Sequence, residues 1–344
     1  MNLKFQLSAS KRTYGVAGVG LFGKGVEVID IPSEHRGKPV TEIFEFAFKG
    51  CDNLREVRVS EGVVAIGSGA FYGCSSLEAV TLPESIKRIS NDAFFGCGKL
   101  ASISVAESFS EEKSIGSGGP TFKSLNGNLY SGDGTELVKY APSNTDREFN
   151  VPDGVRAIST YAFSDCASLE RVSIGNDVVE VRKNSFRGCE SLKSVVITDK
   201  VKTIGSDAFH GCRGLESVVI EGEVVAVGES AFYGCESLES VTLSNRITVI
   251  SNSAFRNCKK LSRVNIPTGV TEIGEWAFHN CESLESLTIP VGVAKIGSWA
   301  FNGCAKLALR SPAREAHEGW AEDWNPDKRP VVWLCDFNDF LEKL

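Results

Sequence analysis

Residues 70–92 read AFYGCSSLEAVTLPESIKRISND, and the Ala-Phe pair that begins this stretch begins the next one at residue 93. The same pair, with one Ser-Phe variant, recurs through the 344-residue chain. Ten of the eleven cysteines keep this phase, because 23 residues or three times 23 residues separate them. They are Cys51, Cys74, Cys97, Cys166, Cys189, Cys212, Cys235, Cys258, Cys281 and Cys304. A fixed period of this length predicts a solenoid of stacked coils.

The apolar positions also recur in phase, so each of them must face the same surroundings in every coil. Residues 80–82 alternate apolar and polar side chains, which predicts a short strand. Such strands stack into a parallel sheet with neighbours about 4.8 Å apart. A second apolar pair and the Ala-Phe pair are expected to line the opposite wall as short strands or 3₁₀ segments. Since no segment has the pattern of a regular helix, the predicted class is a β-rich repeat solenoid, capped at both ends.

The 23-residue pattern resembles the BspA-like class of leucine-rich repeats over nearly the whole chain. It differs from the general consensus L-x-x-L-x-L-x-x-N/C-x-L, because its cysteine precedes the strand. The resemblance implies a right-handed superhelix with a parallel β-sheet on one face. BspA-like proteins are commonly surface or secreted proteins of microbes, implicated in adhesion to host matrix proteins and to other cells. The resemblance therefore implies protein recognition or adhesion.

The repeat and its interruptions divide the chain into five segments. They are an N-terminal β cap (1–40), leucine-rich repeats (41–105), irregular repeats with a β-hairpin insertion (106–150), leucine-rich repeats (151–309) and a C-terminal Trp-rich cap (310–344). The hairpin is predicted within residues 122–140, around Asp133-Gly134. It is either a partner-specific contact or a tolerated insertion in the stack, and the second reading is favoured.

The cysteines are expected to fill the core. Cysteines in adjacent coils point in parallel about 4.8 Å apart, whereas a disulfide needs converging Cβ atoms. The sequence contains no C-x-x-C pair, which a zinc site would typically use. A free cysteine behaves as a small, buried hydrophobic residue. Cys335 is out of phase, and it is either a residue of the cap or a free thiol.

Composition and motifs argue against several classes of protein. The net charge of −7 and the lack of a Lys/Arg cluster argue against nucleic acid as the main partner. No apolar run is long enough for a membrane helix, and residues 1–6 do not resemble a signal peptide. No P-loop, G-x-S-x-G or H-E-x-x-H motif is present. His210 and His279 fall three coils apart, roughly 14 Å, which is too far to share a metal. We therefore expect no catalysis, no cofactor and no metal site.

The candidate binding surface is the strip of residues that point outward between the buried strand positions. These residues are mostly small and hydroxylated, with arginines at separated points. Solenoids use long, shallow faces of this kind for extended partners, although Ser and Thr are also convenient solvent-facing residues. The strip comprises Arg58, Thr81, Arg171, Ser173, Ser194, Ser217, Ser240, Thr242, Arg263, Asn265 and Thr288.

Tryptophans form a second candidate surface. Trp276 and Trp299 precede the Ala-Phe pair in the last two coils, and Trp320 lies in the C-terminal segment. They are expected to pack in or under a C-terminal lid. The alternative is an aromatic patch that stacks on a carbohydrate.

Three functions follow from these features. The first is a non-catalytic protein that binds an extracellular matrix or cell-surface protein, which would place it at the cell surface or in the medium. The second is an intracellular interaction scaffold in the cytoplasm, favoured by the free cysteines and by the lack of a signal peptide or anchor motif. The third, less favoured, is a carbohydrate-binding module that holds a glycan on Trp276, Trp299 and Trp320.

Overall fold

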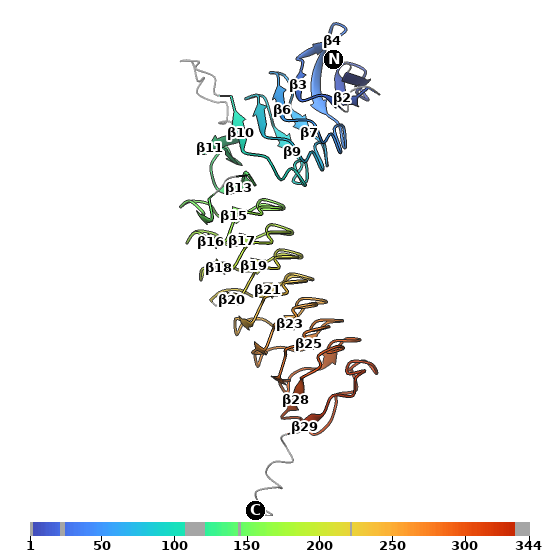
Figure 1. Cartoon of the computed structure of the whole chain (residues 1–344), viewed down its shortest axis with the longest axis vertical. Coiled ribbons are helices and arrows are strands. Elements are labelled where there is room, and N and C mark those ends of the chain that lie inside the picture. Colours follow the sequence, from blue (N-terminus) through green and yellow to red (C-terminus); the bar gives the residue numbers. More distant parts are fainter. Residues whose placement is uncertain (1–2, 21–24, 107–120, 144–145, 221, 334–344) are drawn as a thin grey trace, which may run out of the picture. The chain divides into compact units, whose positions relative to one another are not determined.

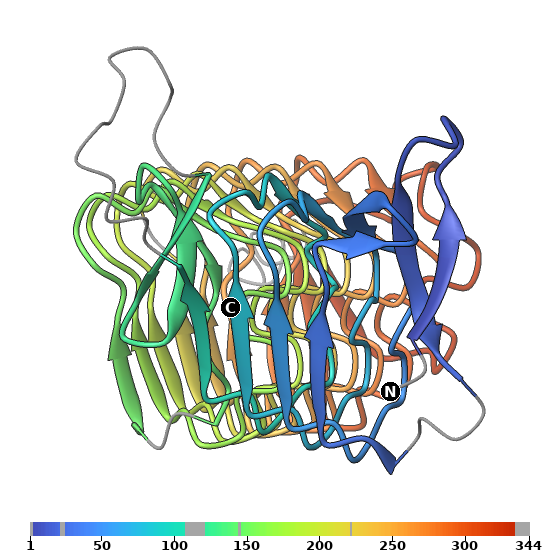
Figure 2. The ribbon, with the colours of Figure 1, turned by 90° about the horizontal axis from the view of Figure 1, so that it is seen from above.

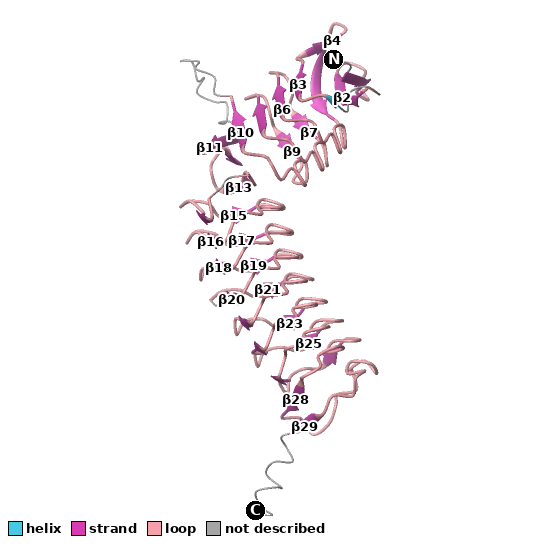
Figure 3. Cartoon of the chain, viewed as in Figure 1, coloured by secondary structure: helices cyan, strands magenta, loops and turns pink. Residues whose placement is uncertain are grey.

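The computed structural model describes residues 3–20, 25–106, 121–143, 146–220 and 222–333. Cys335 and residues 107–120 of the irregular segment lie outside these ranges. The chain divides into two compact units, Met1–Thr145 with Ile158–Ser168, and Asp146–Ala157 with Leu169–Leu344 (Figure 1). Strands and turns build both units, and the described ranges contain no α-helix (Figure 3). The predicted right-handed β-solenoid of leucine-rich repeats is confirmed.

The first unit carries two sheets. One is wholly parallel, with the order β10-β8-β6-β3, and Figure 2 shows its blue to blue-green strands side by side. Its strands are β3 (Val28–Ile31), β6 (Glu56–Val59), β8 (Ala79–Leu82) and β10 (Ser102–Val105). The other has the order β1-β2-β5-β7-β9, with β4 paired to β5. Its strands are β1 (Leu3–Leu7), β2 (Tyr14–Val19), β4 (Glu34–His35), β5 (Lys38–Ile43), β7 (Ala65–Ile66) and β9 (Arg88–Ile89).

A three-stranded antiparallel meander also belongs to the first unit. It consists of β11 (Phe122–Leu125), β12 (Asn128–Ser131) and β13 (Glu136–Lys139). In the β12–β13 turn, the Asp133 carboxylate accepts hydrogen bonds from the Ser131 hydroxyl (2.6 Å) and from the amide and hydroxyl of Thr135 (3.0 Å each). These bonds, led by that from Ser131, lower the pKa of Asp133 to about 2. The carboxylate therefore holds the turn closed.

The second unit repeats the same coil with less interruption. Its longest sheet is parallel, and each residue pairs with the residue 23 positions later. That sheet contains β14 (Glu148–Asn150), β16 (Arg171–Ser173), β18 (Ser194–Val196), β20 (Ser217–Val219), β22 (Ser240–Thr242) and β24 (Arg263–Val264). A further sheet contains β26 (Ser286–Thr288), β28 (Ala308–Ser311) and β29 (Val331–Trp333).

Two-residue strands form the wall behind these sheets. They are β15 (Ala157–Ile158), where the chain passes between units, and β17 (Glu180–Val181), β19 (Thr203–Ile204), β21 (Ala226–Val227), β23 (Val249–Ile250), β25 (Glu272–Ile273) and β27 (Lys295–Ile296). In this wall β17, β19 and β21 pair in parallel with the same 23-residue step, and so do β23, β25 and β27. The expected short strands of the opposite wall are therefore present.

The phenylalanines of the repeat stack into a buried column in each unit. Phe48, Phe71 and Phe94 form one column, and the six rings from Phe186 to Phe301 form the other. Neighbouring ring centroids lie 5.0 to 5.6 Å apart, within the range of favourable offset stacking. Because one ring enters the column per coil, the Ala-Phe pair must recur at the period of the solenoid.

The in-phase cysteines lie beside these rings as buried thiols. In at least seven coils the Sγ–H donates a hydrogen bond of 3.0 to 3.2 Å to the backbone oxygen of the Phe one coil earlier. Burial raises the pKa of Cys235 and of Cys258 well above the ordinary thiol value. These thiols link consecutive coils as hydrogen-bond donors, which explains why the period is so strict at this position.

Aromatic side chains close the C-terminal end of the second unit. Trp320 is 9% exposed, and its indole Nε1–H donates to the Val293 oxygen at 3.0 Å. The Trp324 ring stands edge-on to Phe301, with centroids 5.9 Å apart, and to Trp320, with centroids 4.9 Å apart. These contacts cover the last phenylalanine of the column, as a terminal coil requires.

Candidate functional site

The outward side of the second unit's long sheet is the principal candidate, and we call it the strand face. It consists of the outward residues of β16, β18, β20, β22 and Arg263 of β24. The central residues of β16, β18, β20 and β22 are valines buried in the core. Their neighbours on either side therefore point outward. This alternation creates two columns of outward side chains, in which neighbours lie on strands about 4.8 Å apart. The first column consists of Arg171, Ser194, Ser217, Ser240 and Arg263. The second consists of Ser173, Val196, Val219 and Thr242.

The centre of the strand face is apolar. Val196 is 59% exposed and Val219 is 49% exposed, and the two are direct register partners on β18 and β20. The outward strip predicted from the sequence passes through both valines, but its binding candidates are the hydroxyl, charged and amide residues. The sequence signal for an exposed apolar pair is the two doublets Val195-Val196 and Val218-Val219, because only one valine of each doublet can face the core.

Hydroxyl groups flank these valines without internal partners. Within the described ranges, the side chains of Ser194, Ser217 and Ser240 make no hydrogen bond to protein atoms. They stand next to one another in register. Three spare hydroxyl groups beside two exposed valines offer both hydrogen bonds and apolar area to a bound chain.

The charged residues of the strand face differ in their surroundings. Arg171 forms an exposed ion pair with Glu148 of β14. Arg263 is exposed and has no ion-pair partner in the described part of the chain. The carboxamide oxygen of Asn265 accepts a hydrogen bond from the Leu243 amide at 3.1 Å. Arg263 is therefore the cation most available to a partner.

Other candidates of the strip lie elsewhere. Arg58, on β6 of the first unit, binds both carboxylate oxygens of Glu56 at 2.7 and 2.8 Å and approaches Asp30 at 3.5 Å. The hydrogen bonds that the Arg58 guanidinium donates to Glu56 raise the Arg58 pKa. The Ser104 hydroxyl donates to the Thr81 hydroxyl at 3.3 Å. Thr288 belongs to β26, in a separate three-stranded sheet. These groups are satisfied internally or lie apart from the strand face.

The three tryptophans do not share one surface. Trp276 and Trp299 are 38% and 43% exposed, whereas Trp320 is buried in the C-terminal lid. The Arg256 guanidinium lies 5.1 Å from the Trp276 ring and 5.7 Å from that of Tyr233. His210 stacks on Tyr233, with centroids 4.6 Å apart. Trp276 thus adjoins a half-buried ladder of aromatic and cationic groups.

Histidines in this ladder have depressed pKa values. Desolvation, reinforced by Arg187, lowers the pKa of His210, and desolvation, reinforced by Arg256, lowers that of His279. No group of three or more His, Cys, Asp or Glu side chains that could hold a metal occurs among the described residues. The described ranges likewise contain no helix long and apolar enough to cross a membrane.

Comparison with solved structures identifies the same architecture in bacterial proteins. A leucine-rich repeat protein from Eubacterium ventriosum superposes with a TM-score of 0.66 at 22% identity, covering 93% of this chain and 96% of that chain. The pneumococcal vaccine antigen PcpA superposes with a TM-score of 0.54 at 16% identity, covering 96% and 97%. No curated protein sequence matches the chain significantly. At these identities the likenesses concern the fold.

The sequence profile described as the BspA type leucine rich repeat region matches the chain in six copies. The matches span residues 26–118, 138–258 and 179–308, which together cover most of the chain. They include the strands that form the strand face and the coils that carry the phenylalanine and cysteine columns. The chain therefore belongs to the BspA-type family of leucine-rich repeat proteins.

Proposed function

We propose that the chain is a non-catalytic protein-binding protein that holds an extended segment of its partner on the strand face. The observation that carries the proposal is the exposed pair Val196 and Val219, flanked by three serine hydroxyls with no partner in the described ranges. Burying the outer halves of both valines stabilises a complex in proportion to the apolar area removed from water. The serines supply hydrogen bonds to a partner's backbone.

The partner we propose is an extracellular matrix or cell-surface protein. Support comes from membership of the BspA-type family, whose proteins resemble this chain in their repeat and are implicated in adhesion. The charge of the chain, −7, favours a partner whose contact segment is neutral or basic overall, with an acidic group opposite Arg263. Such a complex would form outside the cell that makes the protein.

A binding assay on purified matrix proteins tests the proposal. The double variant Val196→Glu/Val219→Glu introduces two charges at the apolar centre and is expected to weaken binding at least about tenfold. The control is Val249→Glu, because Val249 is also exposed but lies on β23, in the wall behind the strand face. Equal loss in the double variant and the control would refute a strand-face site.

Cell fractionation tests the location independently. If native protein is found only in the soluble interior of its cells, the adhesion proposal fails and the intracellular scaffold remains. The strand-face assay would then be repeated with purified intracellular proteins. The site and the compartment are thus tested by separate measurements.

A further inference from the structure

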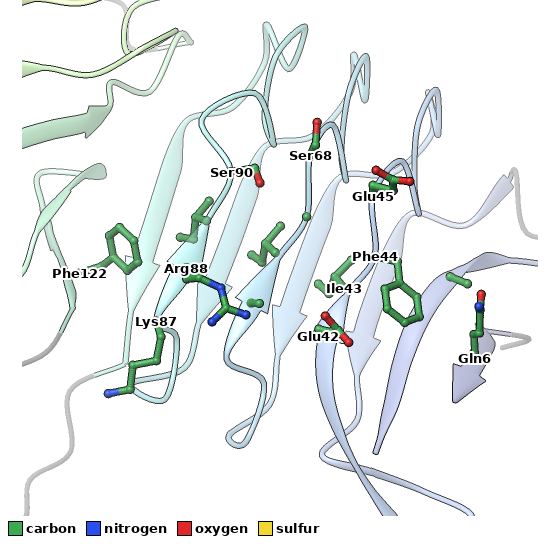
Figure 4. A pocket seen from close by; sticks show the side chains of 15 residues that line it. Gln6, Glu42, Ile43, Phe44, Glu45, Ser68, Lys87, Arg88, Ser90 and Phe122 are labelled. Carbon is green, nitrogen blue, oxygen red and sulfur yellow. The ribbon is translucent and has the colours of Figure 1, made fainter. Parts of the chain in front are cut away.

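The first unit contains a large groove that the strand face does not include. Its volume is about 1010 Å³, and it lies over β5, β7 and β9, with contributions from Gln6, Ala17 and Phe122 (Figure 4). This sheet is the wall on the other side of the coil from β3, β6, β8 and β10. A pocket of this size is at the upper end of the range that holds small ligands.

The floor of the groove is set by strict register. Glu42, Ala65 and Arg88 are Cα partners across the three parallel strands. Ile43 and Ile66, which follow the first two in sequence, are buried beneath them. Since Ala65 contributes only a methyl group, the floor is low at its centre, between a carboxylate on β5 and a guanidinium on β9.

The backbone positions that carry the two opposite charges are therefore held apart. Glu42 and Arg88 are separated by two strand spacings, about 9.6 Å between Cα atoms. Arg88 extends over the strands toward the side of Glu42 (Figure 4). Within the described residues, neither side chain has an ion-pair partner within 4 Å. The negative charge of Glu42 and the positive charge of Arg88 therefore lie on opposite sides of the groove floor, and neither is paired with an opposite charge among the described residues.

The second unit shows what the same column does without the alanine. There Glu272 and Lys295 occupy adjacent strands and form an ion pair of 2.7 Å. Opposite charges one strand apart thus pair with each other, whereas insertion of Ala65 leaves Glu42 and Arg88 available. This internal comparison indicates that the charges of the groove suit a ligand that carries both signs.

Two aromatic rings limit the length of that ligand. Phe44 stands beside Glu42, and its ring lies so close to Gly15 that a Cβ there would be 2.4 Å from it. Phe122 of β11 lines the end beyond Arg88 (Figure 4). Both rings are half-buried. A ligand that lies along the line from Glu42 to Arg88 is therefore bounded at each end.

We infer that this groove binds a short free peptide of about three residues, with its ammonium group at Glu42 and its carboxylate at Arg88. An extended peptide advances about 3.3 Å per residue, so three residues match the two strand spacings between the Cα atoms of Glu42 and Arg88, and the Arg88 side chain swings back from its inclined position (Figure 4) to meet the terminal carboxylate. The Arg88 guanidinium can hold the terminal carboxylate with two parallel hydrogen bonds. Lys87, next to Arg88, adds a second positive charge at the same end. Small side chains fit over Ala65.

Isothermal titration calorimetry with trialanine tests the inference on the full chain. Trialanine is expected to bind, and acetylation of its amine or amidation of its carboxylate is expected to weaken binding about fivefold each. Arg88→Gln should weaken the binding of trialanine about fivefold but leave the affinity for the amidated peptide unchanged, because the substitution and the amidation remove the same contact. Glu42→Gln should likewise weaken the binding of trialanine about fivefold and leave the affinity for the acetylated peptide unchanged. The control is Lys295→Gln, which changes an equivalent charge in the second unit and should have no effect.

Three results would overturn the inference. The first is no detectable heat with trialanine at millimolar concentration. The second is equal weakening by Arg88→Gln and Lys295→Gln, which would indicate a general charge effect. The third is undiminished affinity for pentaalanine blocked at both ends, which would assign the groove to internal segments of proteins. Far-UV circular dichroism of each variant confirms that the fold is kept.

Discussion

The thiol of Cys258 donates a hydrogen bond to the backbone oxygen of Phe232, one coil earlier, across 3.2 Å. The same oxygen accepts the amide N–H of Cys235 at 3.2 Å. One carbonyl thus joins a local turn to the next coil. The sulfhydryl group occupies the space of a small apolar side chain and still donates a hydrogen bond, which alanine or valine would not do.

Alkaline pH is expected to destabilise the protein through its buried thiols. Burial raises the folded-state pKa of Cys235 above the ordinary value of 9.0. Above about pH 9 the unfolded thiol loses its proton while the folded thiol keeps it, so the unfolded state binds fewer protons. The free energy of unfolding therefore falls as pH rises, and is unaffected below pH 8. Urea titrations between pH 7.5 and pH 10 measure the slope.

Cys235→Ser provides the control for this alkaline effect, because a hydroxyl does not titrate in this range. The slope of unfolding free energy against pH should become shallower by up to about 1.4 kcal/mol per pH unit. An identical slope in parent and variant would show that this thiol ionises as readily in the folded protein as in the unfolded chain.

Neighbouring aromatic residues should differ widely in their contribution to stability. Phe232 is fully buried between Phe209 and Phe255, so Phe232→Ala should cost about 3–5 kcal/mol. Tyr233 is half-buried against His210, and Tyr233→Ala should cost about 1 kcal/mol. Chemical unfolding monitored by circular dichroism measures both. Similar losses would contradict the inside and outside assignment of the repeat.

Glycine should have opposite effects at Ser230 and Ser240, which lie in adjacent coils. Ser230 has a left-handed backbone, with φ of 54°, which costs a non-glycine residue about 1–2 kcal/mol. Ser230→Gly relieves this strain and should raise stability by up to about 1 kcal/mol, after the entropy lost by glycine. Ser240 lies in β22, where Ser240→Gly should lower stability by about 0.5–1 kcal/mol. Thermal unfolding of both variants decides the sign.

The ammonium group of Lys139 should be needed for the first unit to fold stably. Lys139 is buried, and its Nζ donates to the Tyr161 oxygen and the Ser164 hydroxyl, both at 3.0 Å. Lys139→Met keeps most of the apolar stem and removes both charge-assisted hydrogen bonds, while the Tyr161 oxygen still accepts from the amide and the hydroxyl of Ser164. A loss of about 2–3 kcal/mol is expected from urea unfolding. A neutral result would mean that solvent replaces the ammonium group.

The sequence predicted most of the fold because the period itself carries the information. Phe71, Cys74 and Val80 recur in phase, and all three are buried as expected. The position of a residue within the coil therefore predicted whether its side chain is buried or exposed, without knowledge of its neighbours in space. The predicted Asp133-Gly134 hairpin also formed, because its turn depends on adjacent residues.

The candidate sites were less predictable, because they depend on residues that are not in phase. Asp30 of the N-terminal segment lies 28 residues before Arg58, so the period gave no indication that it approaches this cation. The groove likewise needs Phe122, which the irregular segment brings beside β9. Val196 and Val219 occupy outward positions of the strip, so the period predicts their exposure, but it does not indicate that apolar residues there contribute to binding.

Because register partners are separated by one complete coil, the solenoid can be lengthened or shortened by whole coils. Ser217 pairs with Ser194 on one side and Ser240 on the other, so removal of one coil brings equivalent residues together. Residues 208–230 form such a coil, and their excision would join Asp207 to Ala231, as Ser230 is joined to it now. Each excision or duplication would change the strand face by about 4.8 Å. Recombination between repeats could thus alter the reach of this surface while every surviving coil keeps its packing.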